Sequence, residues 1–431
     1  MRYIFPILLG SALFLLSSFV FNTTQSILIG IVFMLVAFWT NEALPLGVVS
    51  LLPIILFPLF HILDLKDVSL NYSKSIIFLF LGGFILAIAV EKINLHKVIA
   101  AKLISIFPKT KRGVVFALSI TSSTLSAFLS NTTTALLLLP IALFLTEDKI
   151  LKARFVLAIA YGASIGGILT PIGTPPNLIL YGFLDDYGLS KLTFIEWMFK
   201  TAPLVFIMLI IVSFILSIGL DKEKIEFKES YNLNKEQKRL SFILGVVVVF
   251  LFLNSFIKIP DALILLSFAL LMFIPKIGFL TWDDTKKIPY EIIFLFGAGF
   301  SIAMAFSKTG LALEISKILL NLNYLTPILL LFAIAFIITF STEITSNTAL
   351  TAIALPIIYE VARESVGVDE RVILMLATIC ASYAFMLPIA TPPNAIAMSS
   401  GVLNVKTMMK FGFLFNIIAI ILTTLFAYFY W

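Results

Sequence analysis

Long apolar runs alternate with short polar stretches along almost the whole chain. Several of these runs reach the roughly 20 residues that a helix needs to cross a bilayer. We therefore expect membrane-spanning helices, eleven in number, at about 4–21, 26–42, 44–60, 75–91, 153–182, 199–219, 240–257, 260–275, 290–306, 369–400 and 409–430.

Two further apolar stretches, 113–146 and 325–360, are interrupted in the middle by polar residues. Each leaves two arms of about 14–16 residues, which is too short for a full span. Irregular backbone at membrane depth is tolerated only inside protein or beside a cavity. The pattern therefore predicts two re-entrant helical hairpins whose polar tips lie inside the protein.

Composition supports a lipid environment. Of the 431 residues, 60% are hydrophobic and 13% are charged, and the mean hydropathy is +1.09. A soluble domain cannot hide so much apolar surface. The single cysteine, Cys380, excludes a disulfide framework. The first run could be a signal peptide, but it is long and lacks a clear cleavage site, so an uncleaved first span is favoured.

The charged stretches predict an orientation. Six basic residues and one acid fall in 91–112, which marks that side as cytoplasmic. The linker 220–239 then lies on the same side, and the acidic stretch 359–371 lies outside. The N-terminus is expected in the cytoplasm and the C-terminus outside, so the net charge of +6 reflects topology rather than nucleic-acid binding.

Polar motifs of the first half recur in the second half, in the same order and nearly the same register. The spacing is 216 or 217 residues for Ser130-Asn131-Thr132 with Ser346-Asn347-Thr348, Leu139-Pro140 with Leu355-Pro356, and Thr174-Pro175-Pro176-Asn177 with Thr391-Pro392-Pro393-Asn394. Gene duplication with a purely structural outcome is the alternative, but polar groups at membrane depth are costly and usually functional.

The expected fold class is an all-α membrane protein built from two inverted-topology repeats. Each repeat has five full spans, an odd number, so the second enters the membrane upside down, as in many secondary transporters. The expected divisions are a first helix at 1–25, repeat one at 26–220, a cytoplasmic linker at 221–239 and repeat two at 240–431. Each repeat contains scaffold helices, one hairpin and one broken helix, at 153–182 or 369–400.

The hairpin tips are candidate binding elements. A helix that begins at a tip presents free N–H groups and the positive end of its dipole, which attract anions. Hydroxyl and amide oxygens can also face a hard cation. A simple N-cap would explain one such tip, but two copies favour a site. The polar residues in question are Ser126, Ser130, Asn131, Thr132 and Thr133 in the first tip, and Thr342, Thr345, Ser346, Asn347 and Thr348 in the second.

Spans 153–182 and 369–400 cannot be continuous helices. Paired prolines remove backbone donors and clash with the preceding turn, and Gly173 permits unusual dihedral angles. Unwound carbonyls could then coordinate Na⁺. A proline kink is the simpler alternative, and its recurrence in both halves argues against a kink alone.

Other mechanisms lack their signatures. The sequence has no Walker-type nucleotide loop, which argues against ATP as the energy source. Neither His61 nor His96 accompanies a nucleophile inside the membrane, so we expect no enzyme. Glu42 and Glu343 are the acids nearest the apolar cores, and either a proton relay or a structural hydrogen-bonding role would fit them.

These motifs resemble those of the divalent anion–sodium symporters (DASS), over nearly the whole chain. The two Ser-Asn-Thr tips and the two Thr-Pro-Pro-Asn runs carry the resemblance, together with Thr40-Asn41-Glu42-Ala43-Leu44-Pro45 and Asn94-Leu95-His96-Lys97. The family implies a plasma-membrane homodimer with a static scaffold and an elevator-like transport domain, carrying dicarboxylates, citrate or sulfate.

The resemblance also implies two Na⁺ sites, which would use Ser126, Ser130, Asn131 and Gly173 in one half and Thr342, Ser346, Asn347 and Ala390 in the other. Substrate would contact Ser130, Asn131, Thr132, Ser346, Asn347 and Thr348, with Thr174, Thr391 and Pro392 nearby. The expected function is sodium-coupled transport of C4-dicarboxylates such as succinate, malate and fumarate. Sulfate or citrate transport, or sodium-independent exchange, stays open, whereas the repeat argues against a channel.

Overall fold

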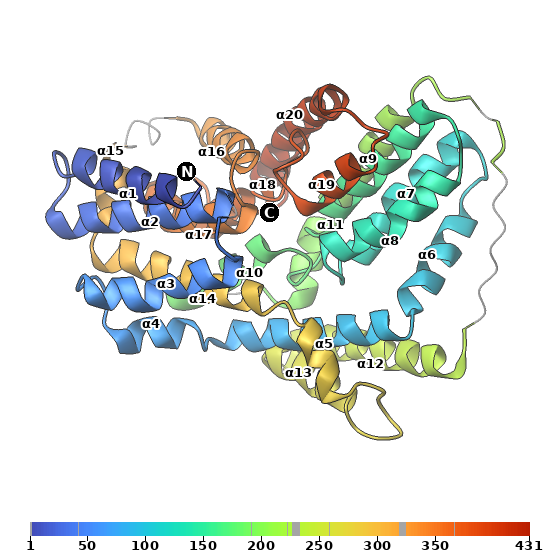
Figure 1. Cartoon of the computed structure of the whole chain (residues 1–431), viewed down its shortest axis with the longest axis horizontal. Coiled ribbons are helices and arrows are strands. Elements are labelled where there is room, and N and C mark those ends of the chain that lie inside the picture. The colour runs from blue at the N-terminus through green and yellow to red at the C-terminus, as the bar shows by residue number, and fades with distance from the viewer. Residues whose placement is uncertain are drawn as a thin grey trace.

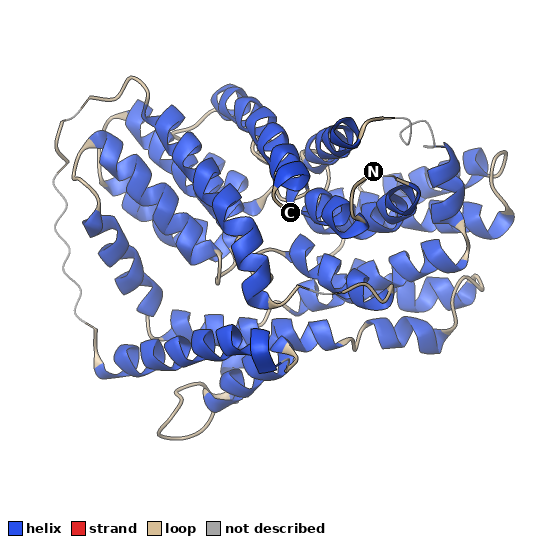
Figure 2. Cartoon of the chain, turned by 180° about the vertical axis from the view of Figure 1, so that it is seen from behind, coloured by secondary structure: helices blue, strands red, loops and turns tan. Residues whose placement is uncertain are grey.

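The computed structural model describes residues 2–41, 43–190, 192–221, 223–225, 233–257, 259–318, 325–365 and 367–431. Within these ranges the regular elements are all helices (Figure 2). Glu42, which was singled out in the sequence, lies outside the described residues.

The first half contains eleven helices in the described residues. They are α1 (Ile4–Ser17), α2 (Thr23–Asn41), α3 (Leu46–Leu59), α4 (Leu65–Asn71), α5 (Ser75–Lys92), α6 (Leu95–Ile106), α7 (Lys111–Ser126), α8 (Asn131–Phe144), α9 (Lys149–Gly166), α10 (Pro175–Asp186) and α11 (Phe194–Ser217).

The second half follows a similar order within the described residues. Its helices are α12 (Lys235–Ile257), α13 (Asp261–Leu271), the 3₁₀ helix η1 (Trp282–Lys287), α14 (Tyr290–Lys308), α15 (Leu311–Ile318), α16 (Pro327–Thr342), α17 (Asn347–Glu364), α18 (Glu370–Cys380), α19 (Pro392–Ser399) and α20 (Val405–Phe429).

Helices occupy every predicted span, and the predicted interruptions are present. The stretch 113–146 forms α7 and α8, and the stretch 325–360 forms α16 and α17. Spans 153–182 and 369–400 are each divided, into α9 and α10 and into α18 and α19. Among the described residues, five helical runs are long and apolar enough to cross a membrane. They are Thr23–Asn41, Leu65–Lys92 (which comprises α4 and α5), Phe194–Ser217, Tyr290–Lys308 and Val405–Phe429.

The helices form two groups that meet near the centre of the molecule (Figure 1). In one group, α1 packs on α2, α3 packs on α14, and α5 packs on α13. In the other group, α7 packs on α9, and α16 packs on α20. The two groups meet where α10 and α17 contact α14.

Small residues allow close helix approach in the second group, as is common in membrane proteins. A Cβ added to Gly166 of α9 would lie 2.2 Å from the carbonyl oxygen of Ser123 in α7, so only glycine fits there. The buried Ser122 hydroxyl donates to the Ile159 carbonyl oxygen at 2.7 Å. These contacts fix the first hairpin firmly against the first broken helix.

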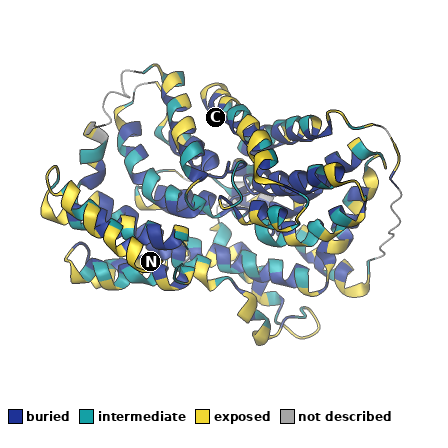
Figure 3. Ribbon diagram, turned by 45° about the horizontal axis from the view of Figure 1, so that its top comes forward, coloured by how far each residue is buried: buried dark blue, intermediate teal, exposed yellow. Residues whose placement is uncertain are grey.

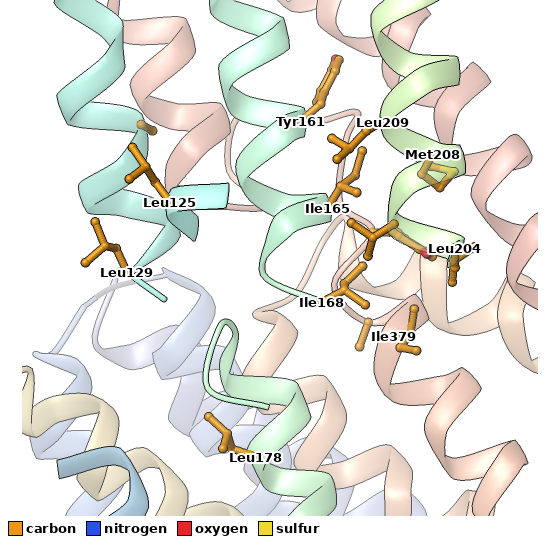
Figure 4. Close-up of a cluster of buried hydrophobic side chains, with 14 of the residues drawn as sticks. Leu125, Leu129, Tyr161, Ile165, Ile168, Leu178, Leu204, Met208, Leu209 and Ile379 are labelled. Atoms are coloured by element: carbon orange, nitrogen blue, oxygen red, sulfur yellow. The ribbon is translucent and has the colours of Figure 1, made fainter. Parts of the chain in front are cut away.

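A continuous apolar core supports the polar elements. Figure 4 shows Ile165 of α9 and Ile168 beyond its end, beside Leu204 and Met208 of α11. The indole nitrogen of Trp197 donates to the carbonyl oxygen of Ile168 at 2.9 Å, at the point where α9 ends. The core therefore extends up to the break in the helix and holds it in place.

Exposed residues lie along the outer faces of the helices (Figure 3). Many of them are large hydrophobic side chains, as a lipid-facing surface requires. On α1 and the turn after it, Leu8, Leu16 and Phe19 are at least 61% exposed. The short helix α15 presents a Glu314–Lys317 ion pair at 2.8 Å and buries Leu311 and Ala312. The charged pair and the buried apolar residues make α15 an amphipathic surface helix.

Candidate functional site

The first tip lies between the end of α7 and the start of α8. Ser130 caps α8, because its hydroxyl accepts from the backbone N–H of Thr133 at 3.0 Å. The hydroxyl of Ser126, at the last position of α7, donates to Asn131 Oδ1 at 2.5 Å. The Asn131 side chain is therefore held across the tip by the preceding helix.

The second tip repeats this link. The hydroxyl of Thr342, the last residue of α16, donates to Asn347 Oδ1 at 2.6 Å and also approaches the Ala381 carbonyl oxygen at 2.8 Å. Ser346 occupies the N-cap position of α17 without a side-chain cap hydrogen bond. Its hydroxyl is thus available for another partner.

The two broken helices are also built alike. Thr174 and Thr391 are extended N-cap residues, and a proline pair begins the helix that follows each. Asn177 donates to the carbonyl oxygens of the residues ten and seven positions earlier, Gly167 and Thr170, at 3.1 and 2.8 Å. Asn394 does the same at 2.9 and 3.0 Å, with acceptors Ala384 and Leu387. The asparagine of each motif therefore closes an unwound loop.

A cavity of about 350 Å³ lies between the two tips and the two unwound segments. On the other side it is bounded by residues of α2, α3, α5 and α14. The described residues that line it include no Lys, Arg, His, Asp or Glu. Its polar lining consists of hydroxyl groups, amide groups and backbone, from Thr40, Ser130, Asn131, Thr132, Gly173, Thr174, Thr345, Ser346, Asn347, Thr348, Ala390 and Thr391.

Two oxygens from cavity-lining residues, Asn131 and Gly173, converge on Gly167. A Cβ built on Gly167 would lie 3.0 Å from Asn131 Oδ1 and 3.2 Å from the carbonyl oxygen of Gly173. Hydroxyl, amide and carbonyl oxygens grouped in this way are suitable ligands for a hard cation. The absence of a Cβ leaves room between them.

The structure brings the predicted site residues together. All of them line the cavity except Thr133, Ser126 and Thr342. The Thr133 hydroxyl accepts from that of Ser130, whereas Ser126 and Thr342 are buried directly behind the tips and hydrogen-bond to the cavity asparagines. Asn177 and Asn394 had no predicted role of their own, although their repetition was the available signal. The role of Glu343 was open, and the structure places its carboxylate against the second unwound segment.

Comparison with known proteins shows the family to which this chain is related. A model of the CitMHS family, described as citrate transporter, matches residues 33–371. Sodium-dependent dicarboxylate transporters named SdcS are 31% identical in Staphylococcus saprophyticus and 32% identical in Staphylococcus aureus. Each alignment covers 98% of this chain and 90% of the relative.

Two solved transporters share the fold at 12% sequence identity. Neisseria gonorrhoeae MtrF, described as illuminating a class of antimetabolite efflux pumps, has a TM-score of 0.64 and covers 92% of this chain and 96% of its own. The Alcanivorax borkumensis YdaH transporter has a TM-score of 0.61, covering 85% and 89%.

The apolar helices and the SdcS relatives indicate a multi-pass membrane transporter rather than an enzyme. The chain belongs to the citrate transporter family, and its resemblance to the divalent anion–sodium symporters is confirmed.

Proposed function

We propose that the chain is a secondary active transporter that couples Na⁺ to the symport of C4-dicarboxylates such as succinate, malate and fumarate. The cavity between the two Ser-Asn-Thr tips carries the proposal, because it offers hydroxyl and amide donors and two helix N-termini without a fixed cation. The names of the SdcS relatives support sodium coupling and a dicarboxylate substrate.

Two Na⁺ sites are proposed, one behind each tip. The first uses Ser126, Ser130, Asn131 and Gly173, and the convergence of Asn131 and Gly173 oxygens on Gly167 supports it. The second uses Thr342, Ser346, Asn347 and Ala390, and the hydrogen bond from Thr342 to Asn347 supports it.

The substrate is proposed to lie between the Na⁺ sites, within the cavity. Its carboxylates would accept from the tip residues Ser130, Asn131, Thr132, Ser346, Asn347 and Thr348, with Thr174, Thr391 and Pro392 beside it. A cavity of about 350 Å³ falls in the range typical of small-molecule sites.

Gly173→Ala is expected to raise the Na⁺ concentration for half-maximal uptake about 5- to 150-fold. The new Cβ would lie 2.5 Å from the Gly167 carbonyl oxygen, so the two loop segments must separate. Such overpacking costs about 1–3 kcal/mol. Sodium titration of uptake measures the change. Gly245→Ala is the control, because its Cβ would meet nothing within 4 Å; equal Na⁺ dependence of both variants would contradict the first site.

Elevator motion of the tips against α2, α3, α5 and α14 is the proposed mechanism. Leu46 of α3 and Ile344 of the second tip line the same cavity, so a bifunctional thiol reagent that spans the cavity should crosslink cysteines at these positions in this state. On a Cys380→Ser background, the yield should change when Na⁺ and succinate are added.

The matched control pair lies within the proposed scaffold. A Cβ on Gly47 would be 3.2 Å from Cγ of Glu291, so Gly47→Cys with Glu291→Cys should crosslink equally under all conditions. Unchanged yield for both pairs would contradict elevator motion.

The proposed setting is a homodimer in the plasma membrane, surrounded by lipid, with the N-terminus cytoplasmic and the C-terminus outside. The inverted repeats and the re-entrant placement of α7–α8 and α16–α17 belong to this proposal. The matching Asn177 and Asn394 loops support the repeats, because both asparagines select acceptors at the same offsets.

Citrate is the second candidate substrate, because the matching family model is described as citrate transporter. Uptake of labelled succinate into proteoliposomes should be inhibited by unlabelled malate and fumarate, and much less by citrate or sulfate. Stronger inhibition by citrate than by malate would favour the second candidate.

A further inference from the structure

Glu343 is a buried acid at the second tip, directly after Thr342, and its side chain is 3% exposed. Its Oε1 accepts from the backbone N–H groups of Phe385 and Met386, both at 2.8 Å, and its Oε2 accepts from that of Leu387 at 3.0 Å. The side-chain amide of Asn416 in α20 donates to Oε1 at 2.7 Å. The carboxylate therefore receives four hydrogen bonds.

These bonds hold the unwound segment that follows α18. Buried N–H groups need an acceptor, and those of residues 385–387 find theirs in the carboxylate rather than in the backbone. Successive N–H groups pointing at one anion form a nest, which favours negative charge. Asn394 holds the carbonyl oxygens of Ala384 and Leu387 from the other side. Side chains thus hold both the N–H groups and the carbonyl oxygens of this segment.

The first half has no such charge. The residue 216 positions before Glu343 is Ala127, and its carbonyl oxygen accepts from the Thr170 hydroxyl. The N–H groups of Ile168 and Leu169 bond locally, to the carbonyl oxygens of Ile165 and Gly166. The first unwound segment therefore needs no carboxylate, and among the described residues the two unwound segments differ by one buried carboxylate.

We infer that Glu343 is a positioning residue that makes the two proposed cation sites unequal. It would fix the segment leading to the Ala390 carbonyl and place a negative charge beside Thr342, so that the second site binds Na⁺ more tightly and fills first. Among the described residues, Glu343 forms no ion pair that would cancel its charge, since its side-chain partner Asn416 is neutral. The inference rests on the proposed function.

Glu343→Gln tests the charge, because it keeps the shape and one acceptor oxygen. In proteoliposomes, half-maximal succinate uptake should require at least about tenfold more Na⁺, whereas the succinate KM at saturating Na⁺ should change less than about threefold. Adding Asn416→Asp to this variant exchanges the amide and the carboxylate between positions 343 and 416, which are hydrogen-bonded to each other in the native chain. The double variant should recover most of the Na⁺ affinity. Glu360→Gln, at a half-buried acid paired with Arg363 on α17, is the neutral control.

Thermal melting and size-exclusion profiles show whether each variant is folded. If Glu343→Gln does not fold, Glu343→Asp and Asn416→Ala are measured instead, because both keep a carboxylate at position 343. In each of these variants the Na⁺ affinity should stay closer to the native value than the maximal rate does. If folded Glu343→Gln kept the native Na⁺ dependence, the inference would be overturned, whereas the proposed function would stand. Native protein whose succinate uptake ignores Na⁺ would overturn the proposed function and the inference with it.

Discussion

Asn131→Ala and Asn347→Ala are each expected to lower succinate uptake about 100-fold or more. Each asparagine links its tip to the preceding helix, through Ser126 or Thr342, and also lines the cavity. Alanine removes an amide oxygen proposed to bind Na⁺ and an amide donor proposed to bind a carboxylate. Hydrogen bonds to charged groups contribute about 1.5–3 kcal/mol each, so losing both kinds of contact is a severe defect. Initial uptake rates in proteoliposomes measure it.

Two other asparagines provide matched controls. Asn22 and Asn404 are exposed residues whose side chains accept from the backbone N–H groups of Gln25 and Thr407 near helix starts. Their replacement by alanine costs about 1 kcal/mol of stability, and uptake should stay near the native rate. If Asn131→Ala or Asn347→Ala behaved like these controls, that residue would not belong to the site.

Succinate affinity is expected to depend steeply on Na⁺. Burying a dianion without compensation is very unfavourable, and each helix N-terminus supplies only about half a positive charge. The described cavity lining has no Lys or Arg to make up the difference. Bound Na⁺ would supply that charge and order the tips before the anion arrives.

Calorimetry of succinate binding in sodium and choline buffers measures this dependence. We expect binding in sodium and none detectable in choline, and by linkage succinate should tighten Na⁺ binding by the same factor. Equal affinity in the two buffers would mean that the tips bind the anion unaided.

The local part of the architecture could be predicted from the sequence, because its signals are local. Proline pairs at Pro175 and Pro392 break helices whatever surrounds them, and the repeated Ser-Asn-Thr motifs mark the two tips. The broken helices and hairpin arms accordingly begin and end close to the predicted positions. The resemblance to the family implied that the four motifs share one substrate site, and the structure places them around one cavity.

The tertiary contacts could not be predicted in this way. Glu343 was visible as an acid beside the second tip, but its donors come from residues 385–387 and Asn416, which are far away in sequence. Trp197 likewise holds the first break through the Ile168 carbonyl oxygen from another helix. Such partners depend on how helices pack, and periodicity along one helix carries no information about them.

Uptake of labelled succinate by purified protein in liposomes tests sodium-coupled transport most directly. With an inward Na⁺ gradient, succinate should accumulate above its external concentration, and Na⁺ ionophore should abolish the accumulation. With K⁺ or choline replacing Na⁺ on both sides, uptake should fall to that of empty liposomes. Equal accumulation with and without Na⁺ would contradict sodium-coupled dicarboxylate symport.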